Sequence, residues 1–107
     1  MSDIIVTTTD VVQDHEVDQY LEIVSGNAMM GANVVKDVFA GIRDIVGGRS
    51  GAYEKEITKG REEAVKDLKN SAKNLGADAV IGVSFDFEEM REGMLWINAT
   101  GTAVKLK

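Results

Sequence analysis

The sequence predicts an α+β domain in two layers, with an antiparallel sheet on one side and helices on the other. Two observations support this fold class. Short stretches of β-branched or alternating residues occur at both ends of the chain, and two segments with helical spacing of apolar residues lie between them. The predicted order of elements is therefore ββααββ. A chain of 107 residues has room for one core only, so we expect a single domain over residues 1–107.

The N-terminal part of the chain predicts two strands. Residues 4–9 are β-branched throughout, which is typical of a strand. Val17–Val24 alternates apolar and polar residues, as a half-buried strand does, and we expect it to form a hairpin with the first strand. The polar segment Asp10–Glu16 between them contains the one histidine of the chain, His15. After the second strand, the glycine-containing segment Ser25–Gly31 is expected to be a connection.

Two helices are predicted in the middle of the chain. The first, Val34–Val46, is apolar around most of its circumference, and such a helix requires burial on more than one side. In so small a domain this indicates a subunit interface. The second helix is expected over about Ala52–Leu75, with charged residues on its outer face. Its predicted buried stripe consists of Ile57, Ala64, Val65, Leu68, Ala72 and Leu75.

The C-terminal part predicts an antiparallel hairpin of two long strands, Asp78–Glu88 and Met94–Leu106, joined by a turn at Glu89–Gly93. In the first of these strands, one face is expected to carry Ala79, Ile81, Val83, Phe85 and Phe87. In the second strand, one face is expected to carry Leu95, Ile97, Ala99 and Ala103, opposite Trp96.

Composition excludes several classes of function. The chain has no cysteine, so it forms no disulfide and offers no thiolate to a metal. Its formal net charge of −6, with no basic stripe, argues against nucleic-acid binding. There is no apolar run long enough to cross a bilayer and no basic-then-apolar leader. We therefore expect a cytoplasmic protein that does not bind membranes.

The segment from Gly41 to Glu56, which joins the two predicted helices, is the candidate site for a ligand. It contains Gly-Gly-Arg-Ser-Gly, and its glycines allow a close approach of the backbone to a neighbour. The start of the second helix offers unpaired amides and a partial positive charge, which suit an anion. A guanidinium supplies a fork of donors that matches carboxylate or phosphate. The candidate ligand-binding residues are Arg43, Asp44, Gly48, Arg49, Ser50, Tyr53 and Glu54.

Other roles for these residues are open. The segment can instead be a tight turn between helices, in which the arginines pair with Asp44, Glu54 or Glu56 across subunits. The residues alone slightly favour this structural role over ligand binding. Ser50 has no histidine nearby in the sequence to act as its base, so no catalytic residue is assigned. Besides the carboxylates, the metal donors available are His15, Met29, Met30, Met90 and Met94. This set does not favour a soft-metal site within one chain, although a ring of carboxylates around an oligomer axis stays open.

The chain resembles the YbjQ family of small bacterial proteins, which carries a heavy-metal-binding description. The resemblance covers nearly the whole length. It is most specific in Gly31–Asn33, Ala40–Glu54, Leu75–Val80 and Gly101–Val104. It implies a dodecin-like subunit assembled as a ring, a homopentamer, with a metal ion as the cofactor its description names. The resemblance does not imply an activity, and it assigns no catalytic residue.

Three functional hypotheses follow. The first is a non-enzymatic, ring-forming module that binds a small ligand or metal ion between subunits, around Arg43–Glu54. The second is an enzyme acting on a small anionic substrate, with Arg49 as clamp and Tyr53 or Glu54 as proton carriers. The third is a purely structural or partner-binding oligomer.

Overall fold

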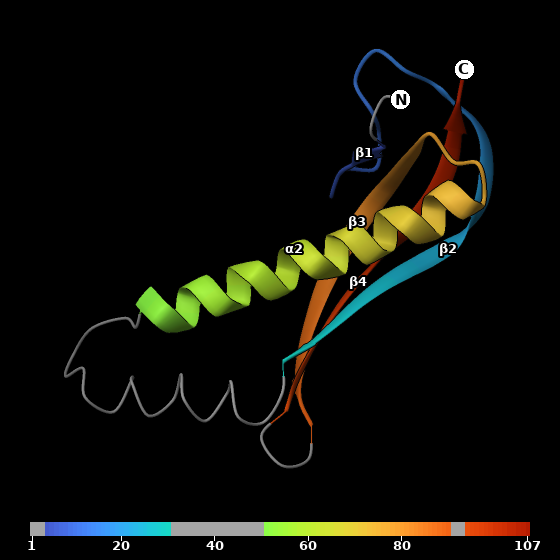
Figure 1. Ribbon diagram of the computed structural model, residues 1–107. Helices are drawn as coiled ribbons and strands as arrows, with labels where there is room; N and C mark the ends of the chain where they lie inside the picture. Colours follow the sequence, from blue (N-terminus) through green and yellow to red (C-terminus); the bar gives the residue numbers. More distant parts are fainter. Residues whose placement is uncertain (1–3, 31–50, 91–93) are drawn as a thin grey trace.

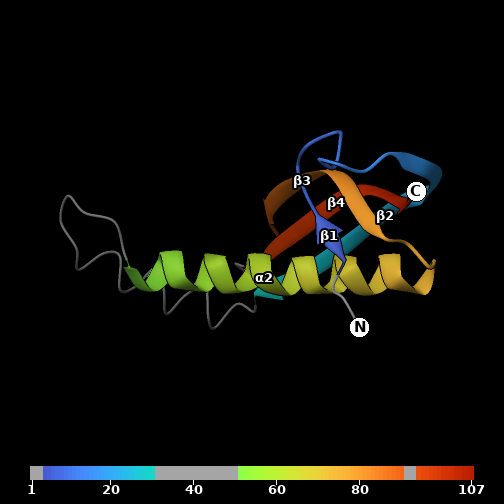
Figure 2. The same cartoon turned by 90° about the horizontal axis from the view of Figure 1, so that it is seen from above.

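The structure is a computed structural model, and it describes residues 4–30, 51–90 and 94–107. Its elements are β1 (Ile5–Val6), β2 (Val17–Met30), α2 (Gly51–Asn74), β3 (Ala79–Glu89) and β4 (Leu95–Leu106). Helix α2 lies across one face of the sheet that the strands form (Figures 1 and 2). The α+β fold in two layers is thus confirmed, and the second helix begins and ends within one residue of its predicted bounds.

The sheet is mixed, so the prediction of an antiparallel sheet is wrong. Its four strands follow the order β1-β3-β4-β2. The pairs β2–β4 and β3–β4 are antiparallel, as predicted for the C-terminal hairpin. Strand β1 pairs in parallel with β3, with Ile5 opposite Ala79, and forms no hairpin with β2. A β-branched run predicts a strand but does not select its partner, and here the backbone of the N-terminal segment completes the edge of β3.

The described elements run β–β–α–β–β and include one helix, which differs from the predicted order ββααββ. The first predicted helix, Val34–Val46, lies outside the described residues.

Strand β2 is longer than predicted, because Ser25–Met30 continues it and is not a connection. The reason is visible at Gly26, which is buried against α2. A Cβ atom at this position would collide with the carbonyl oxygen of Ala64 and the amide nitrogen of Leu68. The glycine is therefore required for close packing of strand and helix, not for a turn.

A register shift between Tyr20 and Glu22 changes which side chains of β2 face the helix. Leu21 and Val24 both pack into the core under α2, three residues apart, which strict alternation does not allow. Ile23 was expected in the half-buried set with Leu21, but it is 78% exposed on the opposite face.

A second bulge, in β3, makes the predicted face of that strand wrong. The register shifts between Ile81 and Ser84, and Gly82 in the bulge has φ of 61°. Val80, Val83 and Phe85 consequently pack with the core under α2, whereas Ala79 and Ile81 join a second cluster with Val104. One extra residue in a strand moves every following side chain to the other face.

The main core lies between α2 and the sheet. Ala64, Leu68 and Ala72 of α2 are fully buried, as predicted. They pack with Ile97, Ala99 and Ala103, which share one face of β4 as predicted. Leu75, which was expected in the buried stripe, is 39% exposed because the helix ends at Asn74 and the chain turns at Gly76. No helix in the described part of the chain is long and apolar enough to span a membrane.

Candidate functional site

The predicted ligand site is only partly within the described residues. Arg43, Asp44, Gly48, Arg49 and Ser50 lie outside them. Tyr53 and Glu54 belong to the first turn of α2, which begins at Gly51, but their side chains are outside the description. This set of residues therefore remains a prediction, and the site described next lies further along the same helix.

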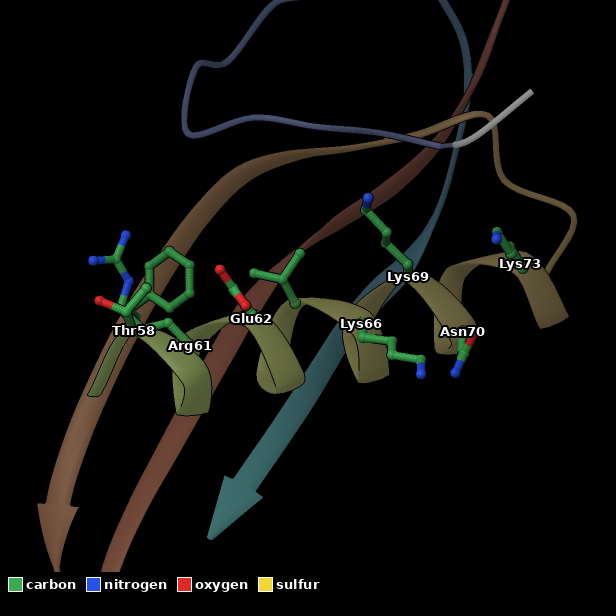
Figure 3. Close-up of a pocket in the computed structure, with 9 residues that line it drawn as sticks. Thr58, Arg61, Glu62, Lys66, Lys69, Asn70 and Lys73 are labelled. Atoms are coloured by element: carbon green, nitrogen blue, oxygen red, sulfur yellow. The ribbon is translucent and has the colours of Figure 1, made fainter. Parts of the chain in front are cut away.

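A groove runs along α2 on the side where the helix meets β3 (Figure 3). Its volume is about 570 Å³, within the range of about 300–1,000 Å³ that is usual for small-molecule sites. Eight of its lining residues come from α2 and one from β3. They are Thr58, Arg61, Glu62, Val65, Lys66, Lys69, Asn70, Lys73 and Phe85. Four of these side chains are cationic and one is a carboxylate, so the groove is basic in a chain of net charge −6.

Arg61 stands over the ring of Phe85 at one end of this groove. The guanidinium carbon lies 5.3 Å from the ring centroid, which is cation–π distance. Phe85 is half-buried and packs against the core, so the ring is a fixed platform. Arg61 forms no ion pair with a carboxylate within the described part of the chain. A cation–π contact does not use the N–H donors of the guanidinium, so they can still bind an anionic group of a ligand.

A second groove of about 510 Å³ adjoins the first and is mainly apolar. It lies between α2 and the N-terminal segment and shares Val65, Lys69 and Phe85 with the basic groove. Its remaining lining residues are Ile4, Ile5, Val6, Thr7, Thr8 and Val83. Lys69 points from the helix toward this N-terminal segment, whereas Lys66 and Asn70 point away from it (Figure 3). The two grooves together combine an apolar floor with a cationic wall.

Comparison with known proteins places the chain in a family. A family model described as "Putative heavy-metal-binding" matches residues 4–107. A UPF0145 protein of Geobacillus kaustophilus is 55% identical over 103 residues, which are 96% of this chain and 98% of that protein. A UPF0145 protein of Halalkalibacterium halodurans is 56% identical over 101 residues, 94% of each chain. The chain belongs to the YbjQ family.

A solved structure resembles this YbjQ-family chain in fold. It is the crystal structure of a protein with unknown function of the DUF74 family from Pediococcus pentosaceus. The TM-score is 0.61 at 15% sequence identity, and the match covers 97% of this chain and 98% of the other. At that identity, the likeness concerns the fold alone.

The donors of the described residues do not fit the heavy-metal description of the YbjQ family. The whole chain has no cysteine, and no group of three or more His, Asp or Glu side chains gathers within the described ranges. Met29 and Met30 line a small hollow of about 160 Å³ with Glu56 and Glu63. Two soft thioethers beside two hard carboxylates are a poor combination for one metal ion. We therefore derive no chemistry from a bound metal here.

A polar ladder occupies the sheet face opposite α2. The Oδ1 atom of Asn27 accepts hydrogen bonds from Trp96 Nε1 at 2.9 Å and from Asn98 Nδ2 at 2.8 Å. Thr100 Oγ1 in turn donates to Asn98 Oδ1 at 2.6 Å. The ladder accepts the indole N–H of Trp96 and orders the side chains on the sheet face away from α2.

The basic groove was missed in the sequence, where the charged residues of α2 were interpreted as a solvated face. The pattern did contain a signal. Arg61, Val65, Lys69 and Lys73 recur every four residues and therefore lie along one side of the helix. The sequence did not predict that Phe85 faces α2, because the face of the sheet on which Phe85 lies depends on the bulge in β3.

Proposed function

We propose that this YbjQ-family protein is a non-enzymatic binding module for a small ligand and that it acts as a homo-oligomer. The observation that carries the binding role is the groove along α2. It has the volume of a ligand site, it is open to solvent, and it mixes apolar and charged side chains as ligand sites do. The family description names a metal, which binds as a cation. The cationic wall of this groove attracts an anion instead.

Homo-oligomer formation is part of the proposal. Large apolar side chains are exposed on the described surface, among them Ile23 at 78%, Tyr20 at 68% and Phe87 at 47%. The predicted helix Val34–Val46 adds further apolar surface that one small domain cannot bury. We propose a ring of dodecin-like subunits, a homopentamer, in the cytoplasm. In that ring, the residues from Arg43 to Glu54 would lie at the contact between subunits.

The test is a native mass spectrum of the untagged protein purified without added ligand, together with light scattering. A multiple of the 11.6 kDa subunit that carries additional, dissociable mass supports both parts of the proposal. A spectrum under denaturing conditions is the control, because mass that persists there is covalent modification and not ligand. A bare monomer at micromolar concentration would contradict the oligomer. An oligomer of bare polypeptide would leave a purely structural ring as the better description.

A further inference from the structure

We infer that the groove beside α2 takes a small organic anion, with its apolar body on Val65 and Phe85 and its phosphate or carboxylate head at Lys69. This inference rests on the proposed binding function and specifies the class of ligand for it.

The charge of the groove determines the sign of the ligand. Among the described residues that line it, Arg61, Lys66, Lys69 and Lys73 are cationic, and Glu62 is the one carboxylate. The protein as a whole carries a formal net charge of −6, so this concentration of cations is local. An anion gains attraction here and meets repulsion over most of the remaining surface, which favours binding at this place.

The adjoining groove determines the apolar part of the ligand. Val83 is 5% exposed and Phe85 is half-buried, and together with Val65 they form a floor fixed by the core. Ile5 is 41% exposed at the side of this floor. A flat or branched hydrocarbon group laid there would remove apolar surface from water, which stabilises the complex in proportion to the area covered.

The position of Glu62 determines where the acidic head lies. Its carboxylate lines the same groove as Arg61, so an anionic head next to it meets a like charge. Lys69 lies two helical turns beyond Arg61 and lines both grooves, where the apolar floor and the cationic wall meet. The head therefore belongs at Lys69. From this arrangement we expect that removing the negative charge of Glu62 strengthens binding of the anion.

The experiment compares three probes that separate head from body. These are 1-naphthyl phosphate, 1-naphthol as the body alone, and inorganic phosphate as the head alone. Binding to the purified full-length protein, in whatever oligomeric state it adopts, is measured by calorimetry, and the site is located by amide chemical shifts. We expect 1-naphthyl phosphate to bind about tenfold more tightly than either part, since both contacts then act in one molecule. The shifts should centre on Val65, Val83 and Phe85.

Charge variants on α2 test the residues. Lys69→Gln should lower the affinity for 1-naphthyl phosphate about fivefold, as expected for loss of one charged contact near the surface. Arg61→Gln should also lower this affinity, and Glu62→Gln should raise it about twofold to threefold. The matched control is Lys59→Gln, which removes the same charge from the other side of the helix and should leave affinity unchanged. Binding of 1-naphthol should be the same in all four variants.

Three results would overturn the inference. The first is equal binding of 1-naphthyl phosphate and 1-naphthol, which would mean that the cations do not take part. The second is equal weakening by Lys69→Gln and Lys59→Gln, which would reveal only a response to net charge. The third is absence of probe binding while Arg61→Gln dissociates the oligomer, which would mean that a second copy of the chain covers the groove. Dissociable mass in the native spectrum with no probe binding would reject this ligand class and leave the proposed function standing.

Discussion

The backbone amide of Asn27 in β2 donates a hydrogen bond of 2.9 Å to Oδ2 of Asp67 in α2. A side chain of the helix thus binds a backbone group at the outer edge of the sheet. Strand β2 is the last strand in the sheet order and pairs only with β4 within it. Next to this bond, Ser71 Oγ donates to the carbonyl oxygen of Ser25 at 3.3 Å. Open strand edges are templates for pairing with other chains. Two polar side chains of α2 thus satisfy edge groups of β2 at the point where helix and strand cross.

Replacing Asp67 by alanine should destabilise the domain by about 0.5–1.5 kcal/mol, the usual net worth of one hydrogen bond at a solvent-accessible site. The amide of Asn27 should then exchange its hydrogen faster. The measurement is urea unfolding together with amide exchange at Asn27. Asp67→Asn is the matched control, because it keeps an acceptor oxygen of the same size, and it should lose less than half as much. An unchanged exchange rate in Asp67→Ala would show that the contact does not hold the edge.

Gly26 should tolerate no side chain, because its Cβ position is filled by the backbone of α2. An alanine there would meet the carbonyl oxygen of Ala64 and the amide of Leu68, and backbone atoms do not rotate away as a side chain does. We expect Gly26→Ala to lower the free energy of unfolding by about 3 kcal/mol or more, at the upper end of the effects of overpacking.

The matched control for Gly26 is Gly60→Ala in the middle of α2. An alanine at Gly60 would meet only the end of the Ile97 side chain, and the substitution also gains helix propensity worth about 0.8–1 kcal/mol. Its cost should therefore be clearly smaller than that of Gly26→Ala in the same thermal or urea melt. Equal losses at both positions would contradict the packing argument.

The fold could be predicted from the sequence wherever hydrophobic periodicity is uninterrupted. Helix α2 and the face of β4 were correct because Ala64, Leu68 and Ala72, and separately Ile97 and Ala99, follow one period throughout. The predicted strand faces were wrong where a bulge interrupts the strand. The alternation of apolar and polar residues does not show where an extra residue is inserted. Gly82 inside an otherwise apolar strand was the one local sign of the bulge.

Partner choice could not be predicted, for a different reason. Strand β1 contributes two residues, and their partners Ala79 and Val80 lie more than seventy positions away in the sequence. Nothing local distinguishes such a parallel pair from a hairpin with the next strand. The groove depended on the same long-range information, since Phe85 had to be placed against Arg61 before the cations of α2 could be interpreted as a site. The predicted loop from Arg43 to Ser50 stays a prediction.

The bulge in β3 should depend on the left-handed backbone of Gly82, whose φ is 61°. The nearest atom to a Cβ there is Asp10 Oδ1 at 3.9 Å, so an added methyl group makes an ordinary van der Waals contact and any cost is conformational. Gly82→Ala should cost about 1–2 kcal/mol of unfolding free energy. Gly82→Asn should cost less, because asparagine adopts this region more readily, and Gly82→Val should cost more. Chemical denaturation of the three variants checks the order, and equal losses would show that strain at φ is not the cause.

The last prediction concerns Asn27, whose Oδ1 accepts from both Trp96 and Asn98. Asn27→Ala leaves the indole N–H and the Asn98 amide without that acceptor, and since Trp96 is half-buried, water replaces it only in part. We expect a loss of about 1–2 kcal/mol in unfolding free energy. Trp96 is the one tryptophan of the chain, so its fluorescence reports directly on this face of the sheet. The emission should shift and become more accessible to iodide in Asn27→Ala. Asn27→Asp retains an acceptor oxygen at the same place and should keep the emission of the native protein, and an identical spectrum in both variants would show that the ladder does not hold the indole.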